Sequence, residues 1–406
     1  MNRQILLVEP NYKNKYPPMG LMKLSTYYKR LGDHVTFFKG NLIDLVLDDT
    51  FEMLKEQLYA NDSTIFWEQY KPQICQYIKK GTRSSLSEVP KVDENPIIEA
   101  LFKFYRQYFY RKRYFEPEFR KYDRVGVTTL FTFYWDITIE TINFAKQLCK
   151  TDDGVMVGGI MASILADRVE AETGITPYIG TLHTPDELDP GNGMIIDALP
   201  LDYSILEEID YQYPASDAYF AYMTRGCVNK CKFCAVPKLE PVYTEFLPVS
   251  EQVHLAEQRY GAKRDLLLLD NNVLASCRFN DIVDDIIAAG FGRNATYASP
   301  NLYEIAVQNL RSGHNDRGYI KSCVRQFRLL LDKVGRNQVQ SVYDLLRDNY
   351  LLEDYTATKK AILDTYEKLR PYFETVYSQK PKQRHVDFNQ GIDARLITDA
   401  NMEKLA

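Results

Sequence analysis

Apolar and polar positions follow two alternating periods near the start of the chain. Residues 5–8 and 35–38 are short apolar runs of the kind that buried strands have. Between these runs, apolar side chains recur every three or four residues until Gly32, which is the pattern of an amphipathic helix and its end. A strand, a helix and a strand in this order predict two parallel strands joined by a right-handed crossover.

The same alternation returns after a long interruption. Residues 43–121 are helical in character and lack strand-length β-branched runs, which predicts a helical insertion. Strand patterns resume at 125–130, 154–159 and 175–179, and helical spacings separate them. Residues 1–182 are therefore predicted to form an α/β domain with a doubly wound parallel sheet and one helical insertion.

The rest of the chain is predicted to hold a second α/β unit. Residues 183–214 carry four prolines and few periodic apolar positions, so they are predicted to be a linker. After them, apolar strand patterns occur at 218–223, 266–269 and 386–389. A second helical insertion is expected at about 301–382, where strand character is almost absent.

Composition and charge narrow the class of protein. The chain has 406 residues, more than one core comfortably organises, and its 45% hydrophobic and 26% charged residues are ordinary for a soluble protein. A net charge of −5 gives no global basic field for nucleic acid. The sequence contains no apolar stretch long enough for a membrane span and no signal peptide at its start. A cytoplasmic protein without membrane partners is expected.

Three of the seven cysteines are clustered. Cys227, Cys231 and Cys234 have the spacing C-x3-C-x2-C and directly follow the strand at 218–223. This order predicts a loop beyond the carboxyl end of a strand, where α/β folds bind ligands, with three thiolates that converge on one small centre. A structural zinc site takes four ligands, whereas an iron–sulfur cluster held by three thiolates leaves one iron open to an outside ligand. Zinc is the alternative.

This motif, with Phe233 before its last cysteine, resembles the signature of the radical S-adenosylmethionine (SAM) superfamily. The resemblance implies that Cys227, Cys231 and Cys234 hold a four-iron four-sulfur cluster whose fourth iron is chelated by SAM. It also implies reductive cleavage of SAM to a 5′-deoxyadenosyl radical that abstracts hydrogen from a substrate. Phe233 and the neighbouring backbone would then approach the adenine.

The end of the next strand carries a second candidate group. In this superfamily the corresponding place receives the amino group of SAM, and here it holds Asp270, Asn271 and Asn272. These letters depart from the usual Gly-Gly-Glu-like stretch, but their side-chain oxygens suit an ammonium group. A turn held by Asx hydrogen bonds is an equal alternative.

A late segment resembles one that is common in the cobalamin-containing branch of the superfamily. It runs from Asn389 to Arg395 after the strand at 386–389. The resemblance implies that Asn389, Gln390 and Arg395 lie near SAM or substrate. Alternatively, Arg395 forms an ion pair with Asp393 that closes the end of the strand.

The N-terminal domain resembles the cobalamin-binding-type domain that precedes many radical SAM barrels. The resemblance rests on the order strand, Pro-Pro-x-Gly at 17–20, helix, and a later strand that ends in Gly158 and Gly159. It implies that these two glycines let the backbone approach cobalamin closely, although tight strand–helix turns also need glycine. The motif that supplies an axial histidine in one cobalamin class is absent, since Asp33 and His34 are adjacent.

The superfamily also sets expectations for the fold and the partners. Its barrel usually has about six strand–helix units, whereas residues 215–406 leave room for roughly three, so a partial (β/α) barrel and a fragment of a longer protein are expected. A partner chain or the second insertion could instead cover the open edge. The implied partners are a small-molecule or peptide substrate and an electron donor such as flavodoxin or ferredoxin. With cobalamin bound, methyl transfer or rearrangement is the implied reaction type.

Two functions of other classes stay open. One is a non-catalytic zinc-binding or nucleic-acid-binding protein, and the other is a degenerate radical SAM scaffold that does not cleave SAM. Residues 106–115 interleave cations with aromatic rings, which suits single-stranded nucleic acid. We favour the other explanation of this segment, a helix that buries its rings while arginine and lysine reach solvent.

Overall fold

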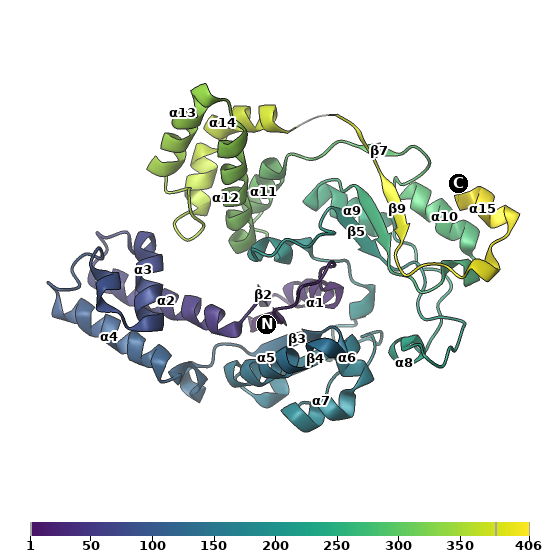
Figure 1. Ribbon diagram of the computed structural model, residues 1–406, viewed down its shortest axis with the longest axis horizontal. Coiled ribbons are helices and arrows are strands. Elements are labelled where there is room, and N and C mark those ends of the chain that lie inside the picture. The colour runs from purple at the N-terminus through teal and green to yellow at the C-terminus, as the bar shows by residue number, and fades with distance from the viewer. Residues whose placement is uncertain (1, 378–379, 406) are drawn as a thin grey trace.

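The N-terminal half is built around a parallel β-sheet. The computed structural model describes residues 2–377 and 380–405, and within them this sheet has four strands in the order β2-β1-β3-β4 (Figure 1). The strands are β1 (Gln4–Glu9), β2 (His34–Lys39), β3 (Arg124–Thr129) and β4 (Val155–Gly159). β1 pairs in parallel with both β2 and β3, so the winding changes direction at β1. The predicted α/β fold with a parallel sheet is confirmed.

Helices cover both faces of this sheet. They are α1 (Met19–Arg30), α5 (Trp135–Leu148), α6 (Ile160–Ile164) and α7 (Ala166–Thr173). Ile5 and Leu7 of β1 pack in the same core as α1, whereas Leu6 and Val8 pack in the core of α5 on the other face. A strand that is buried on both faces needs apolar residues at successive positions, which explains the continuous apolar run of β1.

The strand predicted at 175–179 is wrong, because no strand forms there in the described chain. The backbone N–H of Tyr178 donates to the carbonyl of Val157 at 2.8 Å, so the segment does approach β4. Pro177 precedes Tyr178 and has no N–H to donate, which prevents a regular ladder of hydrogen bonds.

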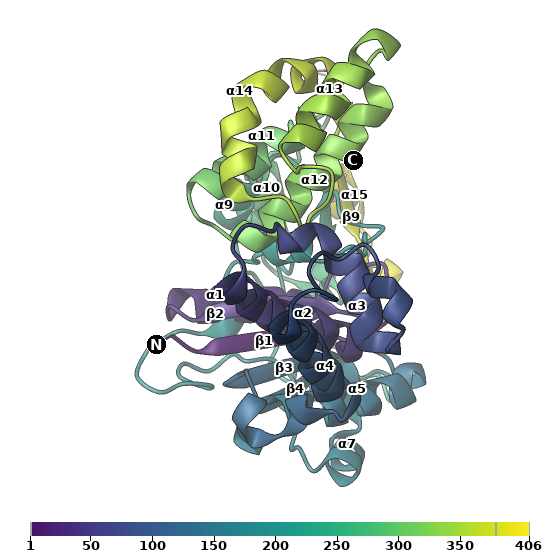
Figure 2. The ribbon, with the colours of Figure 1, turned by 90° about the vertical axis from the view of Figure 1, so that its left-hand side faces the viewer.

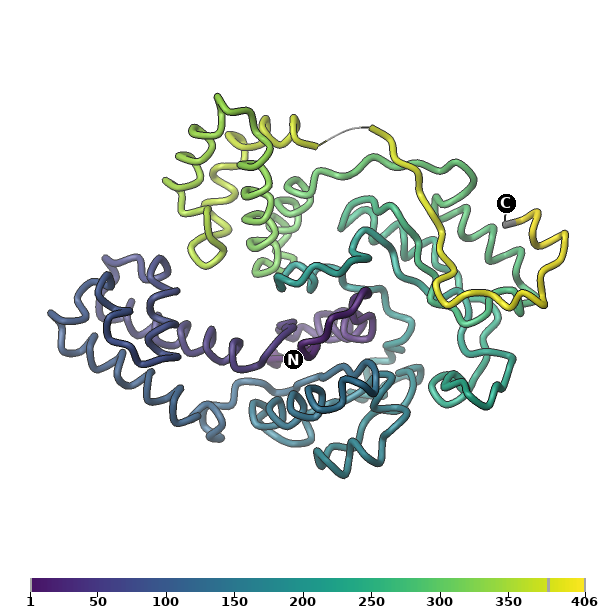
Figure 3. Tube along the Cα trace, in the orientation of Figure 1, coloured from purple at the N-terminus to yellow at the C-terminus, as the bar shows by residue number. Residues whose placement is uncertain are grey.

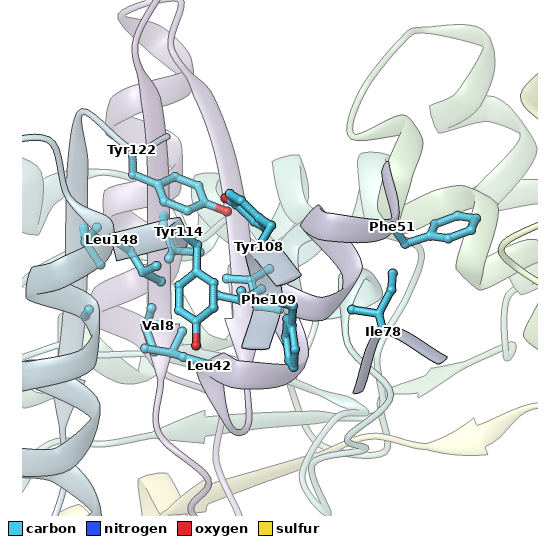
Figure 4. Packing of buried hydrophobic residues seen from close by; sticks show 14 of the residues in the cluster. Val8, Leu42, Phe51, Ile78, Tyr108, Phe109, Tyr114, Tyr122 and Leu148 are labelled. Carbon is cyan, nitrogen blue, oxygen red and sulfur yellow. The ribbon is translucent and has the colours of Figure 1, made fainter. Parts of the chain in front are cut away.

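Helices fill the chain between β2 and β3. They are α2 (Leu42–Asn61), α3 (Lys71–Lys80) and α4 (Pro96–Tyr110). Tyr108, Phe109 and Tyr114, from the segment rich in rings and cations, lie in the core that these helices share with the sheet (Figure 4). The favoured prediction for this segment is confirmed for these rings, which are buried, and for Arg111 and Lys112, which are exposed.

A second parallel sheet forms the C-terminal half. Its strands, in the order β5-β6-β9, are β5 (Ala218–Ala221), β6 (Asp265–Leu268) and β9 (His385–Phe388). The helices of this half include α8 (Val236–Leu239), α9 (Ser250–Tyr260), α10 (Phe279–Ala288) and α15 (Asp399–Leu405). Tyr219 of β5, Leu266 of β6 and Ile282 of α10 belong to one core. Two short strands, β7 (Thr296–Tyr297) and β8 (Lys382–Gln383), pair antiparallel with each other.

A second group of helices lies between β7 and β8. It consists of α11 (Leu302–Arg311), α12 (Asp316–Lys333), α13 (Arg336–Asp348) and α14 (Lys359–Val376). Tyr303, Phe327 and Phe373 help to form a separate core for this group. Figure 2 shows it on the same side of the molecule as α2–α4, and the rings of Phe66 and Tyr350 join the two groups at 4.6 Å between centroids. In the described chain, no helix combines the length and the apolar character that crossing a bilayer requires.

Residues 183–214 form a packed layer between the two halves. The sequence predicts a linker here, and Figure 3 follows this segment (teal) from one half to the other. It also contributes buried side chains to the core that α1 and β1 share with β5 and β6. These side chains are Leu188, Ile196, Leu199, Tyr203, Ile205, Ile209 and Tyr213. Irregular backbone with short turns such as η8 (Tyr203–Glu208) has no apolar period, so sequence patterns do not reveal this packing.

Three aspartates of this segment form ion pairs with cations of the N-terminal half. The pairs are Asp189 with Arg3 and Arg124 (2.8 Å each), Asp197 with Lys23 (2.8 Å) and Asp202 with Lys29 (2.7 Å). Asp202 is buried and also accepts hydrogen bonds from the hydroxyls of Ser25 and Ser204, both at 2.6 Å. Burial alone would raise its pKa, but the Lys29 ammonium, His314 and the Ser204 hydroxyl hold the pKa of Asp202 far below its ordinary value.

We expect Asp202→Asn to destabilise the fold by about 1–3 kcal/mol at pH 7, because it removes the buried carboxylate that accepts hydrogen bonds and compensates the partly buried Lys29 ammonium. The lowered pKa of Asp202 stabilises the native state above the pKa of an unfolded aspartate and loses this effect at lower pH. The difference between wild type and variant should therefore shrink below about pH 4. Urea unfolding at several pH values measures it. Asp364→Asn, at an exposed position of α14, is the control, and an equal effect of both variants would contradict the prediction.

Candidate functional site

A cavity of about 630 Å³ lies between the two halves. Its N-terminal wall is formed by residues 16–21, after β1, and by the carboxyl ends of β3 and β4. Loops that leave β1 and β3 diverge because the winding changes direction there, and this is where open α/β sheets bind ligands. The opposite wall belongs to the C-terminal half and includes Tyr222, Arg225, Val236, Leu239 and Glu240.

Both glycines predicted as cofactor-binding residues line the cavity, but the fold itself requires one of them. Gly159 has φ +107°, and a Cβ at this position would lie 2.3 Å from the carbonyl oxygen of Thr129. A Cβ on Gly158 would have ordinary space, since its nearest neighbour would be the Tyr178 carbonyl oxygen at 3.9 Å. Backbone geometry therefore requires glycine at 159 but does not explain the glycine at 158.

The cysteine motif forms a loop just beyond the carboxyl end of β5, as predicted. Backbone hydrogen bonds between Arg225 and Thr244, at 3.1 and 3.0 Å, close the base of this loop, which we call the cysteine loop (residues 226–243). Cys227 is half-buried, and Cys231 and Cys234 are exposed. Across the described residues, no three His, Cys, Asp or Glu side chains are grouped so as to hold a metal ion, so the three thiols do not converge.

The chemistry of this donor set nevertheless fits a cluster held by three thiolates. All three cysteines are free of disulfide bonds, and they lie on one loop in which Cys231 and Cys234 are open to solvent. The backbone N–H of Asn229 donates to the sulfur of Cys227 at 3.4 Å, a contact that also suits a thiolate. Phe233 exposes 93% of its surface beside Cys234, so its ring is free to stack on a ligand.

Two buried polar atoms lack partners at the carboxyl end of β6. Asp270 is only 3% exposed, and its Oδ1 accepts hydrogen bonds from the Met223 N–H (2.9 Å) and from the backbone and hydroxyl of Thr224. Among the described residues, neither Asp270 Oδ2 nor Asn272 Nδ2 has a hydrogen-bond partner. Each such atom costs about 1–3 kcal/mol when left unsatisfied, so it marks a place that a polar ligand would complete. Desolvation raises the pKa of Asp270.

Asn271 has a different role from its two neighbours. Its side-chain nitrogen donates weakly, at 3.4 Å each, to the Gly226 carbonyl in the cysteine loop and to Glu240 Oε2, and its side chain lines the cavity. The side chains of Asp270 and Asn271 therefore do not form the Asx turn that the sequence offered as the alternative. Asp270 binds the end of β5, and Asn271 binds the cysteine loop.

The residues predicted after β9 separate into two groups. Asn389 accepts a hydrogen bond from the hydroxyl of Tyr16, which lines the cavity, and Gln390 itself lines the cavity. Arg395 is exposed and pairs with Asp393 at 2.6 Å, so the ion pair proposed as the alternative is present. The pair lies beside the cysteine loop, because the pKa of Arg395 is raised first by Asp393 and also by Cys231. The role of Arg395 near SAM or substrate stays a prediction.

Sequence patterns miss an ionic wall of the same cavity. Arg225 pairs with Asp197 and with Glu240 (2.7 Å), and Asp197 also pairs with Lys23 (2.8 Å). All four residues line the cavity. They come from α1, from the connecting segment and from both arms of the cysteine loop, so no spacing in the sequence links them. The position of Arg225, two residues before Cys227, is the one available signal.

No protein-family model matches the chain, and no curated protein matches it. The cysteine loop, the unpaired atoms beside it and the cavity are therefore the features that support a function.

Glycine substitutions separate the two positions at the end of β4. Gly159→Ala should destabilise the protein by about 1–3 kcal/mol or more, because φ +107° is strained for alanine and its Cβ would meet the Thr129 carbonyl. Gly158→Ala should change the free energy of unfolding by less than about 0.5 kcal/mol. Chemical denaturation of both variants measures the difference. Similar losses would show that the backbone also requires glycine at 158.

Proposed function

We propose that this protein is a radical SAM enzyme. When bound, a four-iron four-sulfur cluster and SAM supply reductive cleavage of SAM to a 5′-deoxyadenosyl radical that acts on a substrate. The observation that carries the proposal is a three-cysteine loop at the end of β5 beside unpaired buried polar atoms at the end of β6. A site of this kind combines thiolates for iron with polar groups for an amino-acid-like ligand.

The residues of the chain have distinct tasks in this proposal. Cys227, Cys231 and Cys234 would bind iron as thiolates. Asp270 Oδ2 would accept a hydrogen bond from the ammonium of SAM, since its other oxygen is already occupied. Asn272 Nδ2 would donate to an oxygen of the same ligand. Cys231 and Cys234 are exposed, which leaves access for an electron donor such as flavodoxin or ferredoxin.

The proposal extends to the fold and to the cavity. β5, β6 and β9 would be strands of a (β/α) barrel whose carboxyl ends carry the chemistry. The cavity would hold the substrate, a small molecule or a peptide, or cobalamin, because much of its N-terminal wall is apolar and Gly158 leaves the end of β4 open. No histidine lines it within the described chain, so cobalamin would be held there without an imidazole from these walls.

The cluster is tested by anaerobic reconstitution with iron and sulfide. We expect broad visible absorbance and about four irons per wild-type chain. The triple variant Cys227→Ala, Cys231→Ala, Cys234→Ala should lose both, while Cys277→Ala, at an exposed cysteine outside the motif, should keep them. Wild type with a reductant should also convert SAM to 5′-deoxyadenosine. Zinc in place of iron, or iron uptake that does not depend on these cysteines, would refute the proposal and favour a structural metal site.

The ligand role of Asp270 is tested separately. Asp270→Asn should retain the cluster but bind SAM about 10- to 100-fold more weakly, because a hydrogen bond to a charged group contributes about 1.5–3 kcal/mol. Equilibrium binding of SAM to the reconstituted protein measures the loss. Asp265→Asn, at the other end of β6 and paired with Arg264, is the matched control. Equal SAM affinity in all three proteins would exclude Asp270 from the SAM site.

A further inference from the structure

Arg225 fixes the base of the cysteine loop through its backbone. The residue follows the end of β5, and its N–H and carbonyl exchange hydrogen bonds with Thr244 on the far arm of the loop. Gly226 comes next with φ +68°, and a Cβ there would lie 2.7 Å from the Val242 carbonyl oxygen. The two arms are therefore pressed together directly before Cys227.

The side chain of Arg225 ties the same two arms together a second time. Its Nη1 pairs with Glu240 Oε1 at 2.7 Å, and the other oxygen of Glu240 accepts from the Gly226 N–H at 2.8 Å. The guanidinium also stacks on the ring of Tyr222 at 3.8 Å from its centroid. Glu240 thus contacts both the side chain and the backbone at the entrance of the motif.

The second carboxylate on Arg225 belongs to the connecting segment. Asp197 pairs with Arg225 and, at 2.8 Å, with Lys23 of α1. We call the series Lys23–Asp197–Arg225–Glu240 the ion bridge. It runs from the N-terminal half to the cysteine loop along the cavity wall. The side chains of all four residues are no more than 19% exposed, so each charge depends on its neighbours for compensation.

The chemistry of this bridge requires arginine. One planar guanidinium reaches two carboxylates through separate nitrogens, Nη1 and Nη2, and stacks on a ring at the same time. A lysine ammonium is a point charge that cannot reproduce this fork. An apolar cluster could join the halves at lower desolvation cost, but it would not fix the relative positions of these side chains as four paired charges do.

We propose that Arg225 is a positioning residue for the cysteine loop, and that the ion bridge fixes the base of this loop, and with it the place of the three thiols, beside the cavity. This inference rests on the proposed function, because it assigns Arg225 a task only if these thiols hold a cluster.

The test compares Arg225→Lys with Arg168→Lys in the reconstituted protein. Arg168 is a matched control: it stacks on Trp135 at 4.0 Å and pairs with Glu172 at 3.1 Å, but it lies on α7, outside the cysteine loop and the cavity lining. The measurements are iron content, the electron paramagnetic resonance (EPR) spectrum of the reduced cluster with and without SAM, and kcat and KM for 5′-deoxyadenosine formation.

We expect Arg225→Lys to bind iron like wild type, with an altered EPR response to SAM and a kcat that falls about 10- to 100-fold, the range that a misplaced reacting group produces. Arg168→Lys should match wild type in all of these. Glu240→Gln, which keeps an acceptor for the Gly226 N–H, should reproduce the changes of Arg225→Lys, and the double variant should be no worse than either single one. If Arg225→Lys fails to fold, Glu240→Gln carries the test.

Two results overturn the inference in distinguishable ways. A wild-type protein that binds no iron at its cysteines refutes the proposed function and this inference with it. A wild-type protein with a normal cluster, together with variants whose EPR spectra and kcat are unchanged while only their stability falls, refutes the positioning role alone.

Discussion

The arrangement of the two halves depends on desolvated carboxylates in the segment that joins them. Asp189, Asp197 and Asp202 each meet a cation of the N-terminal half within 2.8 Å. Burial alone would raise the pKa of all three, and the paired cations lower it instead, so the carboxylates stay ionised when buried. An ion buried without its partner is strongly unfavourable, so these pairs permit few alternative placements of the segment. The shape of the cavity between the halves therefore depends on these ion pairs.

The same constraint holds part of the cysteine loop, including Glu240, against the cavity. Asp197 satisfies Lys23 on one side and Arg225 on the other, so the segment that joins the halves also contacts the entrance of the loop. The sheet order of the N-terminal half opens a crevice beyond β1 and β3, and the C-terminal half presents the ends of β5 and β6 to it. A ligand in this space would touch residues that are distant in sequence but held by one network of charges.

The sequence reveals those features that have a local period or spacing. β1 can be predicted from the sequence because a strand covered on both faces is apolar throughout. The spacing of Cys227, Cys231 and Cys234 likewise predicts their common loop at the end of β5. The packing of residues 183–214 cannot be predicted in this way, since their apolar side chains lie on irregular backbone without a regular spacing. The apolar pattern at 175–179 resembles a strand, but Pro177 lacks the backbone N–H that a regular ladder of hydrogen bonds needs. The partners of Arg225 come from three separate parts of the chain, and whether Asp270 Oδ2 is satisfied depends on neighbours that only the folded structure brings near it.

Some departures from ordinary packing lie at the carboxyl ends of β5 and β6. Others lie elsewhere in the described chain, such as the unpaired buried atoms Gln73 Oε1 and Tyr303 Oη, whereas Asp189 and Asp202 of the connecting segment are paired and the rings of Tyr108, Phe109 and Tyr114 are covered. Beyond these two strands, Phe233 is almost fully exposed, and two buried polar atoms lack partners. A fold tolerates such costs where a ligand offsets them, and natural proteins concentrate them at functional sites. The thiols lie among these departures, which favours a ligand-binding role for the cysteine loop over an incidental grouping of cysteines.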